Sequence, residues 1–264
     1  MLQQYLIGFC AIAWFVVFGV VSPCRADTVK IGIGFDLAPY VFAKQRAGLE
    51  VEIIREALRA AGHEAVFVFL PNMRFDIEFA QGNVDGIAVN TEFNLAADSG
   101  RPAFGSQTTV VYENYAIFLK KRNISIHSIA DLVGLNVLGF NNATKFLEPE
   151  FAALMEENPL YSEVTDQSRQ VLMLFNKRVD VVVADKLIFN YWLTRLIRLG
   201  SVELLDMRER LEFARIFAPA PRSVQFADET LRNDFDRGLS KIIQNGLRDA
   251  IESRYGGVGV WGRL

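Results

Sequence analysis

The chain has 264 residues, of which 51% are hydrophobic and 22% are charged, and it carries a formal net charge of −3. A chain of this length can bury a sizeable core and is expected to form one large domain or two small ones. The slightly acidic balance lacks the strongly basic patches with which proteins bind nucleic acid, so we expect no nucleic-acid partner.

The first 26 residues resemble an export signal. The stretch from Leu6 to Val21 is almost entirely apolar, and the only charged residue of the segment is Arg25. An apolar run followed by a small-residue site ending at Ala26 is typical of a signal peptide that is cleaved after export. A permanent membrane span needs about 20 apolar residues. The alternatives to a cleaved signal peptide are an uncleaved membrane anchor and a lipid-modified Cys24. The sequence thus predicts a periplasmic protein with a signal peptide at residues 1–26.

Both cysteines of the chain, Cys10 and Cys24, lie inside this segment, so the mature chain contains none. A disulfide, a thiol nucleophile and a zinc–cysteine site are therefore excluded. The two histidines, His63 and His127, stand in surface-like positions, and the sequence shows no hydrolase, phosphate-loop or zinc motif. We expect no metal, no cofactor and no enzymatic activity, which leaves binding as the leading class of function.

Strands and helices alternate in the first part of the mature chain. Apolar residues at 49, 53, 54, 57, 58 and 61 have helical spacing, and Gly62 is a typical helix stop. The continuous apolar run at residues 65–70 is typical of a strand that is covered on both faces of a parallel sheet. The predicted strands are residues 29–35, 65–70 and 84–89, and the predicted helices are residues 49–61 and 72–81, the second capped by Asn72.

The second part of the chain repeats this order. Its predicted strands are residues 135–140, a weak strand near Glu163 and residues 179–184, and its predicted helices are residues 144–155 and 168–176. The strand-like segments at 108–120 and 213–218 are interpreted as crossings between two lobes. An amphipathic helix at 228–245 and a shorter helix to 255 would then return to pack on the first lobe.

This alternation predicts an α/β fold with two lobes, each a mainly parallel sheet flanked by helices, joined by two crossing strands. We expect lobe 1 to comprise residues 27–110 and 214–255, and lobe 2 to comprise residues 111–213. Residues 256–264 lack any periodicity and are expected to form a flexible tail.

Ligands of open α/β sheets sit beyond the carboxyl ends of the strands, so the residues that follow the predicted strands are candidates for a binding site. Thr144 would receive a carboxylate with its hydroxyl and nearby backbone N–H groups, or would simply cap a helix. Asp185 would pair with an ammonium group or cap the helix that follows it. Arg74 could bind a carboxylate with two parallel N–H groups of its guanidinium. Tyr40 and Phe42 would stack on a ligand or pack in the core of the lobe. The full candidate set is Tyr40, Phe42, Arg74, Asn90, Thr91, Asn142, Thr144 and Asp185.

Several short motifs also occur in a characteristic order along the mature chain. They are APYVF at residues 38–42, GLEVEI at 48–53, LPNMR at 70–74, GNVD at 82–85, IADLVG at 129–134, RVD at 178–180 followed by Asp185, and the final Asn245–Gly246. In this order and spacing they resemble the family 3 extracellular solute-binding proteins, which are receptors of ABC importers for polar amino acids. The resemblance implies the type 2 periplasmic binding protein fold.

The resemblance implies that Asp185 holds the amino group of a ligand and that Thr144 holds its carboxylate. The family usually has an arginine after the third strand that clamps the carboxylate, and Asn94 stands at that position here. Arg74 or Arg101 would have to replace it. The implied function is a monomeric receptor that closes on an amino acid or a similar polar molecule for an ABC importer.

Two alternatives fit the same fold. One is a ligand-sensing protein that reports to a membrane signalling partner instead of a permease. The other is an enzyme similar to the cyclohexadienyl dehydratases, for which Glu92 is the candidate acid in the cleft.

Overall fold

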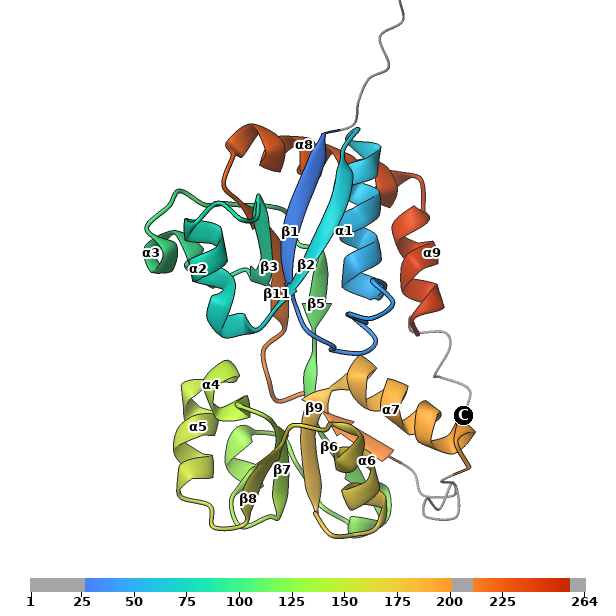
Figure 1. Ribbon diagram of the computed structural model, residues 1–264. Helices are drawn as coiled ribbons and strands as arrows, with labels where there is room; N and C mark the ends of the chain where they lie inside the picture. The colour runs from blue at the N-terminus through green and yellow to red at the C-terminus, as the bar shows by residue number, and fades with distance from the viewer. Residues whose placement is uncertain (1–26, 201–210, 257–264) are drawn as a thin grey trace, which may run out of the picture.

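The computed structural model describes residues 27–200 and 211–256, and these form the two α/β lobes seen one above the other in Figure 1. The two-lobed fold class predicted from the sequence is thereby confirmed. The predicted signal peptide at residues 1–26 lies outside the described residues, as does the predicted tail beyond Gly256. Within the described ranges, no helix combines the length and the hydropathy needed to span a bilayer.

Lobe 1, the upper lobe in Figure 1, is built on a six-stranded mixed sheet. Its strands are β1 (Thr28–Gly34), β2 (Glu64–Leu70), β3 (Gly86–Asn90), β4 (Phe104–Gly105), β5 (Val110–Tyr112) and β11 (Ala220–Phe226). Strands β2, β1 and β3 are parallel, as the strand–helix alternation predicts. Strand β11 pairs in the antiparallel sense with β3, β4 and β5. The carboxyl ends of β1 and β3 therefore point the same way, toward lobe 2.

The helices of lobe 1 follow the sequence pattern closely, with one shift. They are α1 (Leu49–Ala60), α2 (Phe75–Ala80), α3 (Leu95–Ser99), α8 (Glu229–Gln244) and α9 (Leu247–Arg254). Helix α2 begins three residues later than predicted, because the 3₁₀ turn η1 (Asn72–Arg74) precedes it and Arg74, not Asn72, occupies the N-cap position. Asp228 caps α8 by accepting a hydrogen bond from the Leu231 N–H.

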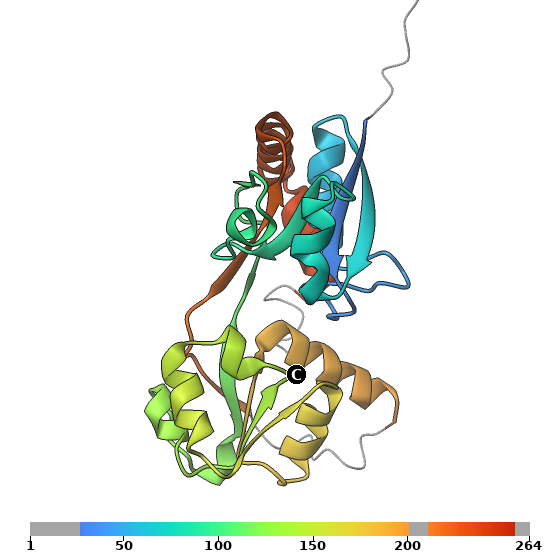
Figure 2. The same cartoon turned by 60° about the vertical axis from the view of Figure 1, so that its left-hand side comes forward.

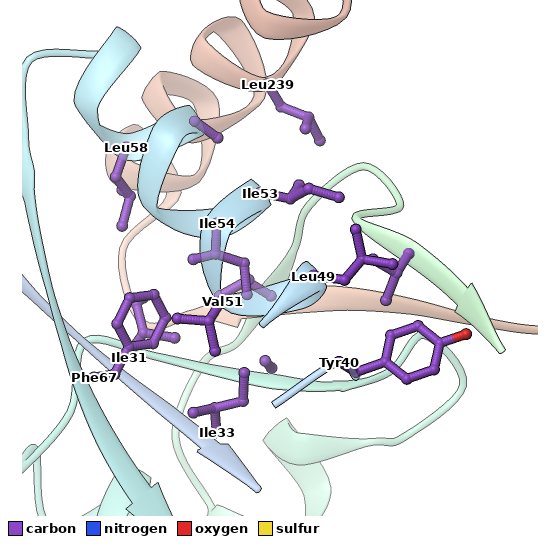
Figure 3. Packing of buried hydrophobic residues seen from close by; sticks show 14 of the residues in the cluster. Ile31, Ile33, Tyr40, Leu49, Val51, Ile53, Ile54, Leu58, Phe67 and Leu239 are labelled. Carbon is purple, nitrogen blue, oxygen red and sulfur yellow. The ribbon is translucent and has the colours of Figure 1, made fainter. Parts of the chain in front are cut away.

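The core of lobe 1 lies between α1 and the sheet. Val51, Ile54 and Leu58 form one fully buried face of α1, and Val51 and Ile54 lie over Ile31 and Phe67 of the sheet in Figure 3. Burying each such aliphatic side chain contributes about 1.5–3 kcal/mol. Helix α8 covers α1 from the other side, and a Cβ at Gly238 would lie only 1.9 Å from the Ala57 carbonyl oxygen. This packing holds α1 against the sheet.

Lobe 2 contains a five-stranded sheet in the order β10-β6-β9-β7-β8. Its strands are β6 (Asn114–Leu119), β7 (Val137–Phe140), β8 (Tyr161–Val164), β9 (Val181–Asp185) and β10 (Leu211–Ala214). Its helices are α4 (Ala143–Phe146), α5 (Pro149–Glu156), α6 (Ser168–Phe175) and α7 (Lys186–Arg198). Strands β7, β8 and β9 are parallel, whereas β6 and β10 run antiparallel to their neighbours.

One predicted helix of lobe 2 is divided. The pattern predicts a single helix at residues 144–155, but the chain is extended at Leu147 and Glu148, and α5 starts again with Pro149 at its first position. Proline disfavours the helical conformation in the residue before it, which accounts for the break. The short helix α4 is therefore free to stand at the cleft while α5 packs in the core.

Two chain segments join the lobes, and Figure 2 shows them running side by side. The first is the continuous run of β5 and β6. The second differs from the prediction of a crossing strand at 213–218, because β10 pairs with β6 inside lobe 2 and the chain returns to lobe 1 as β11. A third contact comes from α7, where Ile188 belongs to the buried cluster of lobe 1 and Trp192 packs against that cluster.

Candidate functional site

A cavity of about 670 Å³ lies between the two lobes. Residues at the carboxyl ends of β1, β3, β7 and β9 line it, which is the position at which open α/β sheets bind ligands. Its polar lining consists of four amides and five charged groups, and its apolar lining is rich in aromatic rings. The polar residues are Glu50, Asn90, Glu92, Asn114, Asn141, Lys145, Gln167, Asp185 and Arg222; the aromatic ones are Phe35, Phe75, Phe93, Tyr112, Phe140 and Phe146.

Asp185 closes β9 and caps α7 at the wall of this cavity. Its carboxylate accepts hydrogen bonds from the backbone N–H groups of Leu187 and Ile188, both at 2.9 Å, and from the Glu113 N–H at 2.8 Å. The Tyr40 hydroxyl donates a fourth bond across the lobes at 3.2 Å. Burial raises the pKa of Asp185 to about 6, although the four hydrogen bonds act in the opposite direction. Asp185 thus caps α7, which is one of the two roles considered for it, and it also lines the cavity.

Tyr40 and Phe42 take part in packing between the lobes. The Tyr40 ring is 3% exposed and lies 4.3 Å from the Tyr112 ring, and burial raises the pKa of the Tyr40 hydroxyl, which therefore keeps its proton and donates to Asp185. Phe42 contacts the rings of Tyr191 on α7 and Tyr255 after α9, with centroids 5.7 and 6.4 Å apart. Neither ring lines the cavity directly.

The sequence interpretation missed an ion pair in the wall of lobe 1. The Arg222 Nε donates to the Glu50 carboxylate at 2.8 Å, and the Tyr112 hydroxyl donates to the other Glu50 oxygen at 3.1 Å. Glu50 is fully buried. The guanidinium of Arg222 also lies 4.8 Å above the Tyr112 ring. Burial alone would lower the pKa of Arg222, but the neighbouring Glu50 charge outweighs it and raises the pKa.

A sequence signal for this pair does exist. Glu50 falls on the same helical stripe as Ile53, Ile54 and Ala57, so its side chain faces the core. A carboxylate on a buried face requires a partner, because an unpaired buried charge is strongly destabilising. The identity of that partner, 172 residues away on β11, cannot be read from the pattern.

Thr144 and Asn142 are already engaged by a carboxylate of the protein itself. The Glu163 side chain on β8 accepts hydrogen bonds from the Asn142 N–H at 2.6 Å and from both the N–H and the hydroxyl of Thr144 at 3.2 Å. The Tyr161 hydroxyl donates a fourth bond at 2.8 Å. Burial alone would raise the pKa of Glu163, but these hydrogen bonds outweigh it and lower the pKa. The place expected for a ligand carboxylate therefore holds Glu163.

The remaining candidates are divided between the cavity and the surface. Asn90 lines the cavity and accepts a hydrogen bond from Arg222 at 3.0 Å. The hydroxyl of Thr91 donates to the Pro221 carbonyl at 3.0 Å, and Thr91 is not among the lining residues. Arg74 is 59% exposed and pairs with Glu78 on α2, at a distance of 2.5 Å, away from the cavity lining.

Arg101 does not supply a clamp either. Its Nη1 donates to the Phe79 carbonyl at 2.8 Å, and its guanidinium lies over the Phe79 ring. Asn94, at the position of the family's arginine, caps α3 by accepting from the Ala97 N–H. Within the described ranges, the cations that line the cavity are Lys145 and Arg222, and the sequence interpretation considered neither of them.

No protein-family model matches this sequence, and no curated protein matches it. Solved structures do match over most of the chain. The probable amino-acid ABC transporter extracellular-binding protein of Bacillus subtilis is 16% identical with a TM-score of 0.66, covering 88% of this chain and 100% of that one. The GluR0 ligand-binding core in complex with L-glutamate is 15% identical with a TM-score of 0.65, covering 88% and 99%.

A third match is a histidine kinase sensor domain with similarity to periplasmic binding proteins, 18% identical with a TM-score of 0.63, covering 88% of this chain and 97% of that one. Together with the two lobes and the cavity between them, these matches define a periplasmic binding protein fold. More particularly, it is the fold shared by amino-acid-binding proteins of ABC transporters and the GluR0 receptor core. At these identities the likeness establishes the fold.

Proposed function

We propose that this chain is a periplasmic receptor that binds a small polar ligand between its lobes by hinge closure and delivers it to the permease of an ABC importer. The observation that carries the proposal is the cavity of about 670 Å³ lined from both lobes. A ligand bound there contacts both walls at once and therefore stabilises the closed arrangement. The amino-acid-binding proteins of ABC transporters among the structural matches support this function.

Asp185 is proposed to receive an amino group of the ligand. It is a buried carboxylate at the cavity, and its fourth hydrogen bond, from the Tyr40 hydroxyl, is the longest of the set at 3.2 Å. An ammonium group would compete for that oxygen as a stronger, charged donor. Binding would thus replace a hydrogen bond from a neutral hydroxyl with an ion pair.

The first test is a calorimetric screen of amino acids, amines, small carboxylates and sugars against the purified mature protein. A ligand at a hundred times its dissociation constant adds about 2.7 kcal/mol of stability, which a thermal shift detects. In Asp185→Asn the side chain can still cap α7 but loses its charge. We expect affinity for an amine-bearing ligand to fall roughly 100-fold, since hydrogen bonds to charged groups contribute about 1.5–3 kcal/mol.

The matched control is Asp228→Asn. Asp228 also caps a helix, by accepting from the Leu231 N–H, but it does not line the cavity. This variant should bind as the parent protein does. Equal affinity of Asp185→Asn and the parent protein would remove Asp185 from the site.

A sensing function is the second candidate, favoured by the match to a histidine kinase sensor domain. The two functions predict different partners for the closed form. Reconstituted permease vesicles should accumulate the ligand only in the presence of a transport receptor. A sensor would leave accumulation unchanged and would instead alter the activity of a membrane kinase.

A further inference from the structure

We infer that the ligand is a small organic cation with an apolar body and without a carboxylate beside its amino group. This inference rests on the proposed function and narrows its ligand class. It follows from the charges that line the cavity, from the groups that could receive an anion there, and from the aromatic walls.

The charges that line the cavity favour a cation. Glu50, Glu92 and Asp185 are acidic, and Lys145 and Arg222 are basic, which gives three negative charges against two positive ones and a formal sum of −1. Glu50 and Arg222 neutralise each other at 2.8 Å. A ligand with one positive charge would neutralise the remaining charge of −1 in the cavity. A zwitterion has no net charge and would leave that negative charge in place.

The buried cation of the cavity already has a protein partner on each of its three guanidinium nitrogens. Arg222 donates from Nε to Glu50, from Nη1 to Asn90 and from Nη2 to the Ala88 carbonyl. A ligand carboxylate placed on Arg222 would approach the buried charge of Glu50, and like charges at short distance repel strongly in a poorly hydrated site. Arg222 is thus a poor clamp for a second anion.

On the opposite wall, the N–H groups of Asn142 and Thr144 at the start of α4 hold the Glu163 carboxylate. Lys145 is then the one cavity cation with neither an ion pair nor a side-chain hydrogen bond inside the described ranges. It is an exposed residue of α4. A flexible, hydrated ammonium of this kind contributes little to the binding of an anion.

The walls fit an apolar body. Phe35 follows β1 and is 54% exposed, and Phe146 at the end of α4 is 53% exposed, so one large open ring comes from each lobe. Phe93, at 36%, adds a third ring to the lobe 1 side. Organic cations bind favourably over aromatic faces, and apolar ligand surface gains from burial there. Glu92, beside Phe93, is exposed and has no partner in the described part of the chain, so its hydrated charge adds only a small attraction for a positive charge.

The test uses amino acids and the amines that differ from them only by the carboxylate. Phenethylamine is compared with phenylalanine, tyramine with tyrosine, and isoamylamine with leucine, so that each amine carries one positive charge and each amino acid is a zwitterion; binding is measured by titration calorimetry with the mature protein. We expect at least one amine to bind and to bind roughly tenfold or more tightly than its parent amino acid. Tighter binding of the amino acid would overturn this inference while leaving the proposed receptor function standing.

Two variants locate the effect. Glu92→Gln should weaken the amine by roughly threefold to fivefold, as expected for a pair of partly hydrated charges. Glu150→Gln, an exposed glutamate of α5 that does not line the cavity, removes the same charge and should leave the affinity unchanged. An amino acid whose binding depends on Lys145, seen as a loss in Lys145→Gln, would also overturn the inference. If no compound of the wider screen binds, the proposed function fails with it.

Discussion

The starts of helices α7 and α4 in lobe 2 each hold a carboxylate with four hydrogen bonds, yet the two carboxylates differ in pKa. Asp185 accepts from three backbone N–H groups and the Tyr40 hydroxyl, and its pKa is raised to about 6. Glu163 accepts from two backbone N–H groups and two hydroxyls, and its pKa is lowered.

Desolvation accounts for the difference. Asp185 is 4% exposed, so the loss of water around its charge outweighs its donors. Glu163 is only partly buried, and a similar donor set suffices to favour its charged form. The count of hydrogen bonds alone therefore does not tell which carboxylate is free for a ligand. Asp185, with an incompletely compensated charge, is the one that would gain from a cation.

Glu50 is a third carboxylate; it is fully buried, and unlike the other two it has a cationic partner. Removing that partner should change the stability of the protein more than any other substitution proposed for these carboxylates. We expect Arg222→Met to lower the free energy of unfolding by about 3–5 kcal/mol, because it leaves an uncompensated buried charge. The double variant Glu50→Gln with Arg222→Met should recover much of the loss. Urea denaturation measures both; a loss below about 1 kcal/mol in the single variant would show that water reaches Glu50.

The pH dependence of stability should have opposite signs for the two lobe 2 carboxylates. The pKa of Asp185 is higher in the folded state than its ordinary 3.8, so the folded state binds more protons and loses stability as pH rises through this window, about 2 kcal/mol between pH 4 and pH 7. Relative to the parent protein, Asp185→Asn should gain stability over that range.

Glu163→Gln is the counterpart. The pKa of Glu163 is lowered by folding, so its contribution is complete above its ordinary value and is lost as pH falls through the folded pKa. The stability of Glu163→Gln should therefore fall furthest below that of the parent protein at neutral pH. Denaturation midpoints measured from pH 3 to pH 8 test both signs, and parallel curves for all three proteins would refute the desolvation argument.

The smallest expected effects come from the tyrosine donors. Tyr40→Phe and Tyr161→Phe each delete one hydroxyl that donates to a carboxylate, at a cost of about 1 kcal/mol in stability. Each should also raise the pKa of its partner, Asp185 or Glu163, as followed by carboxyl carbon chemical shifts in an NMR titration. An unchanged Asp185 pKa in Tyr40→Phe would mean that the hydrogen bond between the lobes is not formed in solution.

Much of the local structure can be predicted from the sequence. The stripe of apolar residues places α1, the apolar runs place β2 and β9, and Asp185 is readable both as a cap of α7 and as a residue at a strand end. The prediction of a single helix at 144–155 was wrong. It followed the spacing of the apolar residues and did not take account of Pro149, which breaks the helix. The second crossing overlaps the predicted range, but it is a link between β10 and β11, two strands with different partners, and not a strand of its own.

The sequence by itself determined the alternation of strands and helices, the two-lobed α/β class and the position of Asp185, because these depend on residues a few positions apart. Only the tertiary structure decided what each carboxylate meets. Arg222 reaches Glu50 from 172 residues away, Tyr40 reaches Asp185 from 145, and Glu163 occupies the N–H groups beside Thr144 from a different element. Contacts between residues so far apart do not appear in the hydrophobic pattern of the sequence. They nevertheless determine which charged groups at the cavity can still pair with a ligand.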